Sequence, residues 1–60
     1  MKKYYFNEEE LQARFDEIMD LIDNEGAHVF ITRNGEPIVV MVPYEYFQKL
    51  ENAVNLGDQV

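Results

Sequence analysis

The sequence contains no cysteine and no serine, and it has one histidine and one threonine. Without cysteine, the fold has neither a disulfide nor a thiolate metal site. With no serine or cysteine, and with His28 as the only histidine, one chain cannot supply the nucleophile, base and orienting group of a covalent hydrolase. We therefore expect no enzymatic activity, no cofactor and no metal ion, and we interpret His28 as a structural or surface residue.

The sequence also lacks a long apolar run. No stretch approaches the roughly 20 apolar residues that span a bilayer, and the N-terminus has no signal-peptide pattern. We therefore expect a cytoplasmic protein.

Basic residues are scarce, since five Lys and Arg stand against 12 Asp and Glu, for a net charge of −7. Any contact with nucleic acid must therefore depend on a local basic patch. Asp16, Asp20 and Asp23 fall on one face of a predicted helix without the spacing of a calcium loop. We interpret them as a solvated acidic face.

The chain is too short for a large core. A domain of 60 residues hides only about 60% of the surface of its unfolded chain. Small folds of this kind usually need disulfides, a metal or a partner subunit. With the first excluded, and with 47% apolar residues including four Tyr and four Phe, oligomerisation is the expected source of stability.

Local patterns predict the first two elements. The aromatic run at residues 4–6 favours a strand. Asn7 then offers a helix N-cap with Glu10 in position to close a capping box, and Gly26 is a suitable stop, which predicts one helix over about residues 8–24. The apolar stripe of this helix is Leu11, Phe15, Ile18 and Ile22.

A hairpin follows. Asn34 and Gly35 stand between two apolar runs, which is the strongest short-range signal for a two-residue turn. This turn places Arg33 opposite Glu36, Ile31 opposite Ile38, and Val29 opposite Val40.

The second hairpin strand, residues 38–42, is apolar on both faces, so each face must be covered by another element. We expect the first helix on one face and a second copy of the chain on the other. Pro43 ends the strand, and Phe47, Leu50 and Val54 mark the apolar stripe of a second helix.

These elements predict an α+β fold of the order strand-helix-hairpin-helix (βαββα), with a small antiparallel sheet, helices packed on it, and completion by homodimerisation. We expect one domain over residues 1–56. Residues 57–60 are expected to form a polar C-terminal tail.

The hairpin carries a family resemblance. The segment VFITRNGEPIVVMVP at residues 29–43 resembles the hairpin signature of the Phd/YefM (prevent-host-death) antitoxin family of type II toxin–antitoxin systems. That signature is an apolar strand ending in Ile-Thr-Arg, a turn with glycine, a proline or small residue, and a second apolar strand. The segment YEYFQKL at residues 44–50 resembles the aromatic helix that follows it in the family.

The resemblance implies a homodimer, with tetramers as a further possibility, that represses its own operon by binding operator DNA and neutralises a partner toxin. It also implies that residues 57–60 are the start of a truncated or very short toxin-neutralising segment. Arg33 and Asn34 then inherit the role of the family's hairpin residues at DNA, and Gln12 and Arg14 that of the early first helix. We add Lys2 and Lys3 as phosphate contacts. The expected dimer interface is Ile38, Val40, Val42, Phe30 and Tyr5, and the expected toxin-binding residues are Phe47, Leu50 and Val54.

The first helix departs from the family, which often has small polar or basic residues where this chain has Glu8, Glu9 and Glu10. These carboxylates repel phosphates unless they point away from DNA. The alternative function is an acidic dimeric interaction module that binds a protein partner but no DNA.

Overall fold

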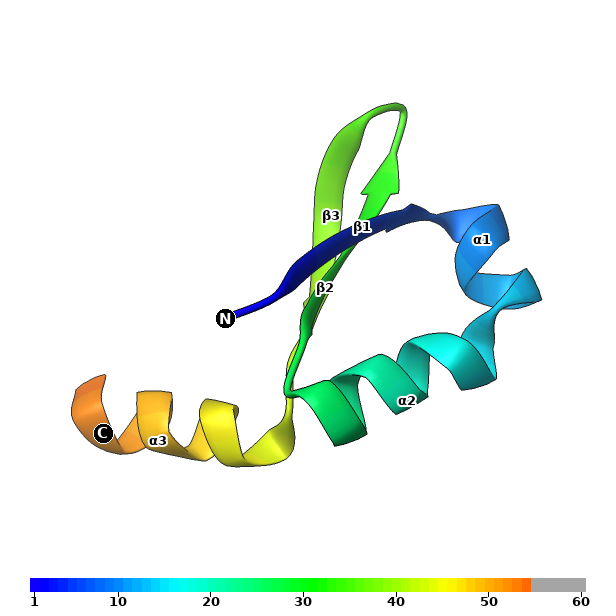
Figure 1. Cartoon of the computed structure of the whole chain (residues 1–60). Helices are drawn as coiled ribbons and strands as arrows, with labels where there is room; N and C mark the ends of the chain where they lie inside the picture. Colours follow the sequence, from blue (N-terminus) through cyan, green and yellow to red (C-terminus); the bar gives the residue numbers. More distant parts are fainter. Residues whose placement is uncertain (55–60) are drawn as a thin grey trace.

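The computed structural model of the protein describes residues 1–54, which form an α+β fold with a three-stranded sheet and three helices (Figure 1). The elements are β1 (Lys3–Asn7), α1 (Glu8–Ala13), α2 (Phe15–Glu25), β2 (His28–Arg33), β3 (Glu36–Met41) and α3 (Tyr44–Val54). The expected tail, residues 57–60, lies outside the described residues.

The sheet is mixed, so the prediction of an antiparallel sheet is wrong. Its strand order is β1-β2-β3, with β1 parallel to β2 and β2 antiparallel to β3. The helical segment between β1 and β2 carries the chain back past the sheet, so both strands start at the same end, as parallel strands with a crossover do.

The first helical segment is broken at Arg14, so the element order differs from the predicted one. Arg14 has φ −123° and ψ 31°, outside the helical range, and α1 and α2 run in different directions in Figure 1. Neither proline nor glycine marks this break in the sequence. The change of direction brings Ile18 and Ile22 of α2 against the sheet, whereas Phe15 of the predicted stripe stays half exposed.

The predicted helix ends are confirmed. The Asn7 side chain accepts a hydrogen bond from the Glu10 backbone N–H, and the Glu10 carboxylate accepts one from the Asn7 N–H, both at 2.8 Å. This is the reciprocal capping box. Gly26 closes α2 in the left-handed conformation, with φ 64°, where glycine is favoured.

The core lies on one face of the sheet. Alternate residues of β1 and β2 point to this face and pack against α2, forming a cluster of Phe6, Ile18, Ile22, Val29 and Ile31. The described residues include six buried apolar side chains but twelve exposed large ones. The core of the chain is therefore small for the amount of apolar surface that its described residues expose.

The hairpin turn is confirmed, but the predicted register beyond it is wrong. Asn34 and Gly35 have φ 52° and 82°, as a two-residue hairpin turn requires, and Arg33 lies opposite Glu36. Farther along, Thr32 pairs with Pro37 and Ile31 with Val39, so Ile38 is an extra residue in β3. Pro37 has no N–H to donate to the ladder, and bulges are among the places where a sheet accepts proline.

This bulge decides which face Val40 occupies. A shift of one residue reverses the direction of every later side chain in a strand. Val40 lies opposite Phe30 instead of Val29, and Phe30 lies opposite Tyr5. These three residues therefore form a row across the sheet, on the face opposite the core.

Helix α3 extends away from the sheet (Figure 1) and has no buried residue. Its Tyr46 ring meets the His28 ring at a centroid distance of 4.3 Å, and His28 is buried, as expected for a structural histidine. The helix is thus attached near the start of β2 and leaves its apolar stripe uncovered.

Candidate nucleic-acid and partner interfaces

Four of the six residues predicted to contact DNA lie at the two ends of the sheet, and the other two, Gln12 and Arg14, lie on α1 and at the break that follows it. Lys2 and Lys3 stand beside the start of β2, where the His28 N–H donates to the Lys2 carbonyl oxygen at 2.9 Å. Arg33 and Asn34 lie at the other end of β2, about 16 Å away at the usual rise per residue of a strand. The structure therefore does not bring these cations into one patch.

Arg33 is held by Glu8. The Arg33 Nε donates to Glu8 Oε1 at 3.1 Å, and Nη2 donates to Oε2 at 2.8 Å. The two side chains meet because β1 and β2 are parallel and Asn7 lies opposite Thr32. Glu8 and Arg33, which follow these two residues, are therefore also neighbours. Hydrogen bonding to Arg33 lowers the pKa of the Glu8 carboxyl, and the carboxylate raises the pKa of Arg33.

Arg14 occupies the break between α1 and α2 and also has an acidic partner. Its guanidinium bonds to Glu17 at 2.9 and 3.3 Å and lies 5.1 Å from the centre of the Phe6 ring. The contact with Glu17 raises the pKa of Arg14 and lowers that of Glu17. Gln12 is exposed on α1.

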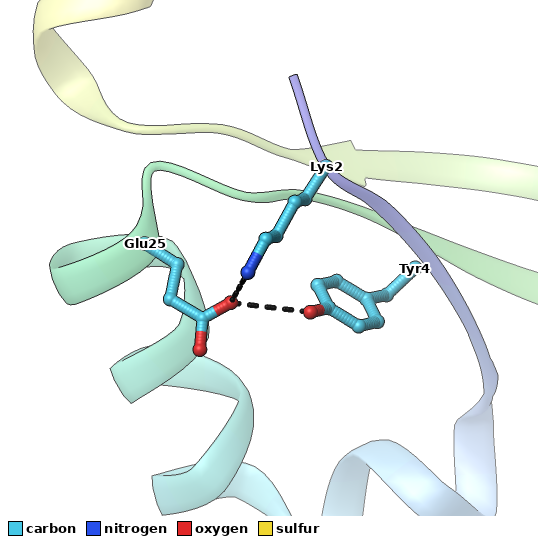
Figure 2. Close-up of polar contacts among 3 residues, drawn as sticks. All are labelled: Lys2, Tyr4 and Glu25. Carbon is cyan, nitrogen blue, oxygen red and sulfur yellow. Dashed lines mark hydrogen bonds and ion pairs between the residues drawn. The ribbon is translucent and has the colours of Figure 1, made fainter.

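Lys2 is tied to the end of α2. Figure 2 shows its ammonium group and the Tyr4 hydroxyl meeting the same oxygen, Glu25 Oε1, each at 3.1 Å. The hydrogen bond from Lys2, and then that from Tyr4, lowers the pKa of Glu25. The Lys3 side chain lies elsewhere, over the ring of Phe30, with its Nζ 6.0 Å from the ring centre.

The sheet face opposite the core is apolar and accessible. Tyr5 and Phe30 stack with ring centroids 4.9 Å apart and planes inclined by 15°. Tyr5 is 59% exposed, Val40 49% and Ile38 46%, and Phe30 and Val42, the other two residues expected at the dimer interface, are partly exposed. No helix within residues 1–54 covers this face, because α1 and α2 pack on the other side.

The stripe predicted for toxin binding is a second accessible apolar surface. Phe47, Leu50 and Val54 are all exposed on α3. Between the start of α3 and α2 lies an open groove of about 910 Å³, whose lining includes Asp16, Asp20 and Asp23. The expected acidic face of the first helical segment is therefore one wall of a groove.

Sequence reasoning missed the partner of Arg33. From the sequence, the three glutamates of the first helical turn form one group that repels phosphates, but the structure separates them. Glu8 pairs with Arg33, and Glu10 closes the capping box. Only the parallel pairing of β1 with β2 places Glu8 beside the hairpin, and no local pattern specifies that pairing.

Other kinds of site find no support in the part of the chain that the structure describes. Within residues 1–54, no helix is both long and apolar enough to cross a membrane. In the same range, no three acidic or histidine side chains gather in a way that can hold a metal ion.

The exposed apolar sheet face and the uncovered α3 stripe are typical of a protein that works by binding other macromolecules. The family model for the antitoxin Phd_YefM of type II toxin–antitoxin systems matches residues 7–60. The chain therefore belongs to the Phd/YefM antitoxin family, whose members are generally not enzymes. No curated protein and no solved structure gives a significant match.

Proposed function

We propose that this protein is a cytoplasmic antitoxin that forms a homodimer, represses its own operon by binding operator DNA, and neutralises a partner toxin by direct binding. Family membership supports the antitoxin class. The DNA-binding part rests on one observation: Arg33 is 60% exposed at the hairpin tip, next to Asn34 of the two-residue turn.

Dimerisation supplies the second cover that the sheet needs. Six buried apolar residues make a small core. Each further large apolar side chain that becomes fully buried stabilises the folded state by about 1.5–3 kcal/mol. A second copy placed against the row of Tyr5, Phe30 and Val40, with Ile38 and Val42 beside it, buries such side chains twice. β3 is also an edge strand of the sheet, and exposed apolar edge strands are prone to pair with another chain.

A symmetric dimer carries two hairpin tips at a fixed separation, which matches the two half-sites of a palindromic operator. Arg33 and Asn34 then approach the DNA from each subunit. Gln12 and Arg14 contribute from α1 and the break that follows it, and Lys2 and Lys3 contribute phosphate contacts outside the central site.

Toxin binding is assigned to α3. Phe47, Leu50 and Val54 form an uncovered stripe on one face of this helix. An amphipathic helix that lays its apolar face in a groove of its partner is a common mode of recognition.

A second candidate function is a dimeric module that binds a protein partner but no DNA. One observation favours it: Lys2, Arg14 and Arg33 are each already paired with a carboxylate. DNA binding weakens steeply with salt, by a slope near −0.9 for each phosphate neutralised, so the salt dependence of binding separates the two candidates.

The test is a binding titration with the duplex that lies upstream of the protein's own reading frame. Arg33→Ala is expected to lower the affinity by roughly 1–3 kcal/mol and to leave the dimer intact. Lys49→Ala on α3 is the control, because it removes the same charge from a position away from the hairpin. An unchanged midpoint for Arg33→Ala, or equal losses in both variants, would contradict the proposed site.

A further inference from the structure

The pair between Glu8 and Arg33 joins the start of α1 to the last residue of β2, 25 positions apart in the sequence. Two parallel hydrogen bonds between a carboxylate and a guanidinium restrict both side chains to one relative orientation. The Arg33 guanidinium is therefore restricted in orientation as well as in position, although 60% of its side chain is exposed.

The pair leaves a defined set of donors free. A guanidinium has five N–H groups, and Glu8 takes one from Nε and one from Nη2. The edge formed by Nη1 and the second N–H of Nη2 still offers two parallel donors. Two such donors match the O6 and N7 acceptors of guanine in the major groove.

The pair also cancels charge. Glu8 is ionised near neutral pH, because its pKa is lowered, so the two side chains together carry no net charge. Attraction to phosphates, which is the same for every DNA sequence, depends on that charge. Hydrogen bonding to a base edge depends on the donor geometry, which the pair preserves.

We propose that Glu8 is a positioning residue that sets the sequence selectivity of Arg33, by cancelling its charge and holding its free Nη1–Nη2 edge outward for a guanine. This inference rests on the proposed DNA binding. A carboxylate that only competes with DNA for Arg33 has a different consequence, since its removal then strengthens binding to all sequences by the same factor.

The experiment compares Glu8→Gln with Glu9→Gln in the full chain. Glu9 is exposed in the same helical turn, so its variant loses the same charge and leaves the Arg33 pair in place. Each protein is titrated with the upstream duplex and with a scrambled duplex of the same length and composition, over a range of salt concentrations. Circular dichroism verifies that each variant is folded.

In Glu8→Gln we expect tighter binding to the scrambled duplex and a salt slope that is steeper by about 0.9 per subunit. The ratio of the two affinities is expected to fall by about five- to tenfold, because an unrestrained Arg33 loses much of its discrimination between bases. In Glu9→Gln both affinities are expected to rise together, with an unchanged ratio.

A second variant separates positioning from simple charge. Lysine pairs with Glu8 as a point charge but does not present two parallel donors. Arg33→Lys is therefore expected to lower the ratio as Glu8→Gln does, and adding Glu8→Gln to it is expected to change the ratio no further.

Two results would overturn the inference. In one, Glu8→Gln keeps the wild-type ratio or changes it only as much as Glu9→Gln does. This result leaves the proposed function intact, provided that Arg33→Ala still weakens binding. In the other, the wild-type protein does not distinguish the upstream from the scrambled duplex, and the proposed operator binding fails together with the inference.

Discussion

The ring of Tyr46 meets the imidazole of His28 edge-on, with centroids 4.3 Å apart and planes inclined by 64°. His28 is the first residue of β2 and is buried, whereas α3, which carries Tyr46, has no buried residue. This contact packs one aromatic side chain of the helix against the start of β2. The stripe of Phe47, Leu50 and Val54 therefore stays free for a partner.

Leu50→Asp tests this stripe. Because Leu50 is 49% exposed in the subunit, we expect the free energy of unfolding to change by no more than about 0.5 kcal/mol. We expect binding to the protein encoded by the adjacent reading frame to weaken by about 2 kcal/mol or more, as at the centre of an interface. Calorimetric titration and thermal unfolding measure the two effects.

Asn52→Asp is the matched control for Leu50→Asp, because it introduces the same carboxylate on the opposite side of the same helix. Its binding should equal that of the wild type. The assignment of α3 to toxin binding is wrong if both variants bind as the wild type does.

Val40→Asp tests the dimer. In the proposed dimer, a carboxylate in the row with Tyr5 and Phe30 replaces apolar area that the interface buries by a charge without a partner. The dimer dissociation constant should therefore rise by at least about 30-fold, or roughly 2 kcal/mol. Sedimentation equilibrium measures this constant. The thermal midpoint should also depend on protein concentration in the wild type, because dimerisation stabilises the folded state.

Met19→Asp provides the comparison, since Met19 is also an exposed apolar residue but lies on α2, outside the open sheet face. It should leave the dissociation constant close to that of the wild type. A wild-type protein that is a stable, folded monomer at micromolar concentration would refute the shared interface altogether.

The contact of Glu25 with Lys2 and Tyr4 predicts a pH dependence in the acid range. The pKa of Glu25 in the folded protein lies below its ordinary value of about 4.5. Its stabilising contribution is therefore fully present above that value and is lost as the pH falls through the folded-state pKa. The pKa of Lys2 is raised, so its contribution is lost only when the pH rises through that raised value.

Titration of the Glu25 carboxyl by NMR checks this prediction. Lys2→Met should raise the pKa of Glu25 more than Tyr4→Phe does, because the hydrogen bond from Lys2 is the larger cause of the lowering. Tyr4→Phe keeps the ring and removes only the hydroxyl. In Glu25→Gln, the free energy of unfolding should fall less steeply with decreasing pH, and a larger effect from Tyr4→Phe would contradict the assignment.

Much of the candidate surface could be predicted from the sequence, because apolar side chains without partners are visible as a pattern. Residues 38–42 are apolar on both faces in a chain too short to cover them, and the structure leaves Val40 exposed. The ion pairs between distant segments could not be predicted. Arg33 and Glu8 are 25 positions apart. In a chain with 12 Asp and Glu, the sequence does not indicate which carboxylate pairs with an exposed arginine.

Features that depend on neighbouring residues follow from the sequence alone. The capping box joins Asn7 to Glu10 across one helical turn, and the hairpin turn needs only the positive φ angles of Asn34 and Gly35. Each of these features involves four consecutive residues or fewer, so a local sequence pattern is enough to specify it.

Three features became visible only in the folded chain: the break at Arg14, the parallel pairing of β1 with β2, and the bulge at Ile38. Each depends on how distant segments pack, because the break lets α2 reach the sheet and the bulge sets the face of Val40. The pair of Glu8 with Arg33 follows from the same strand pairing. Local patterns carry no information about such contacts, since their stability arises only when the whole sheet has formed.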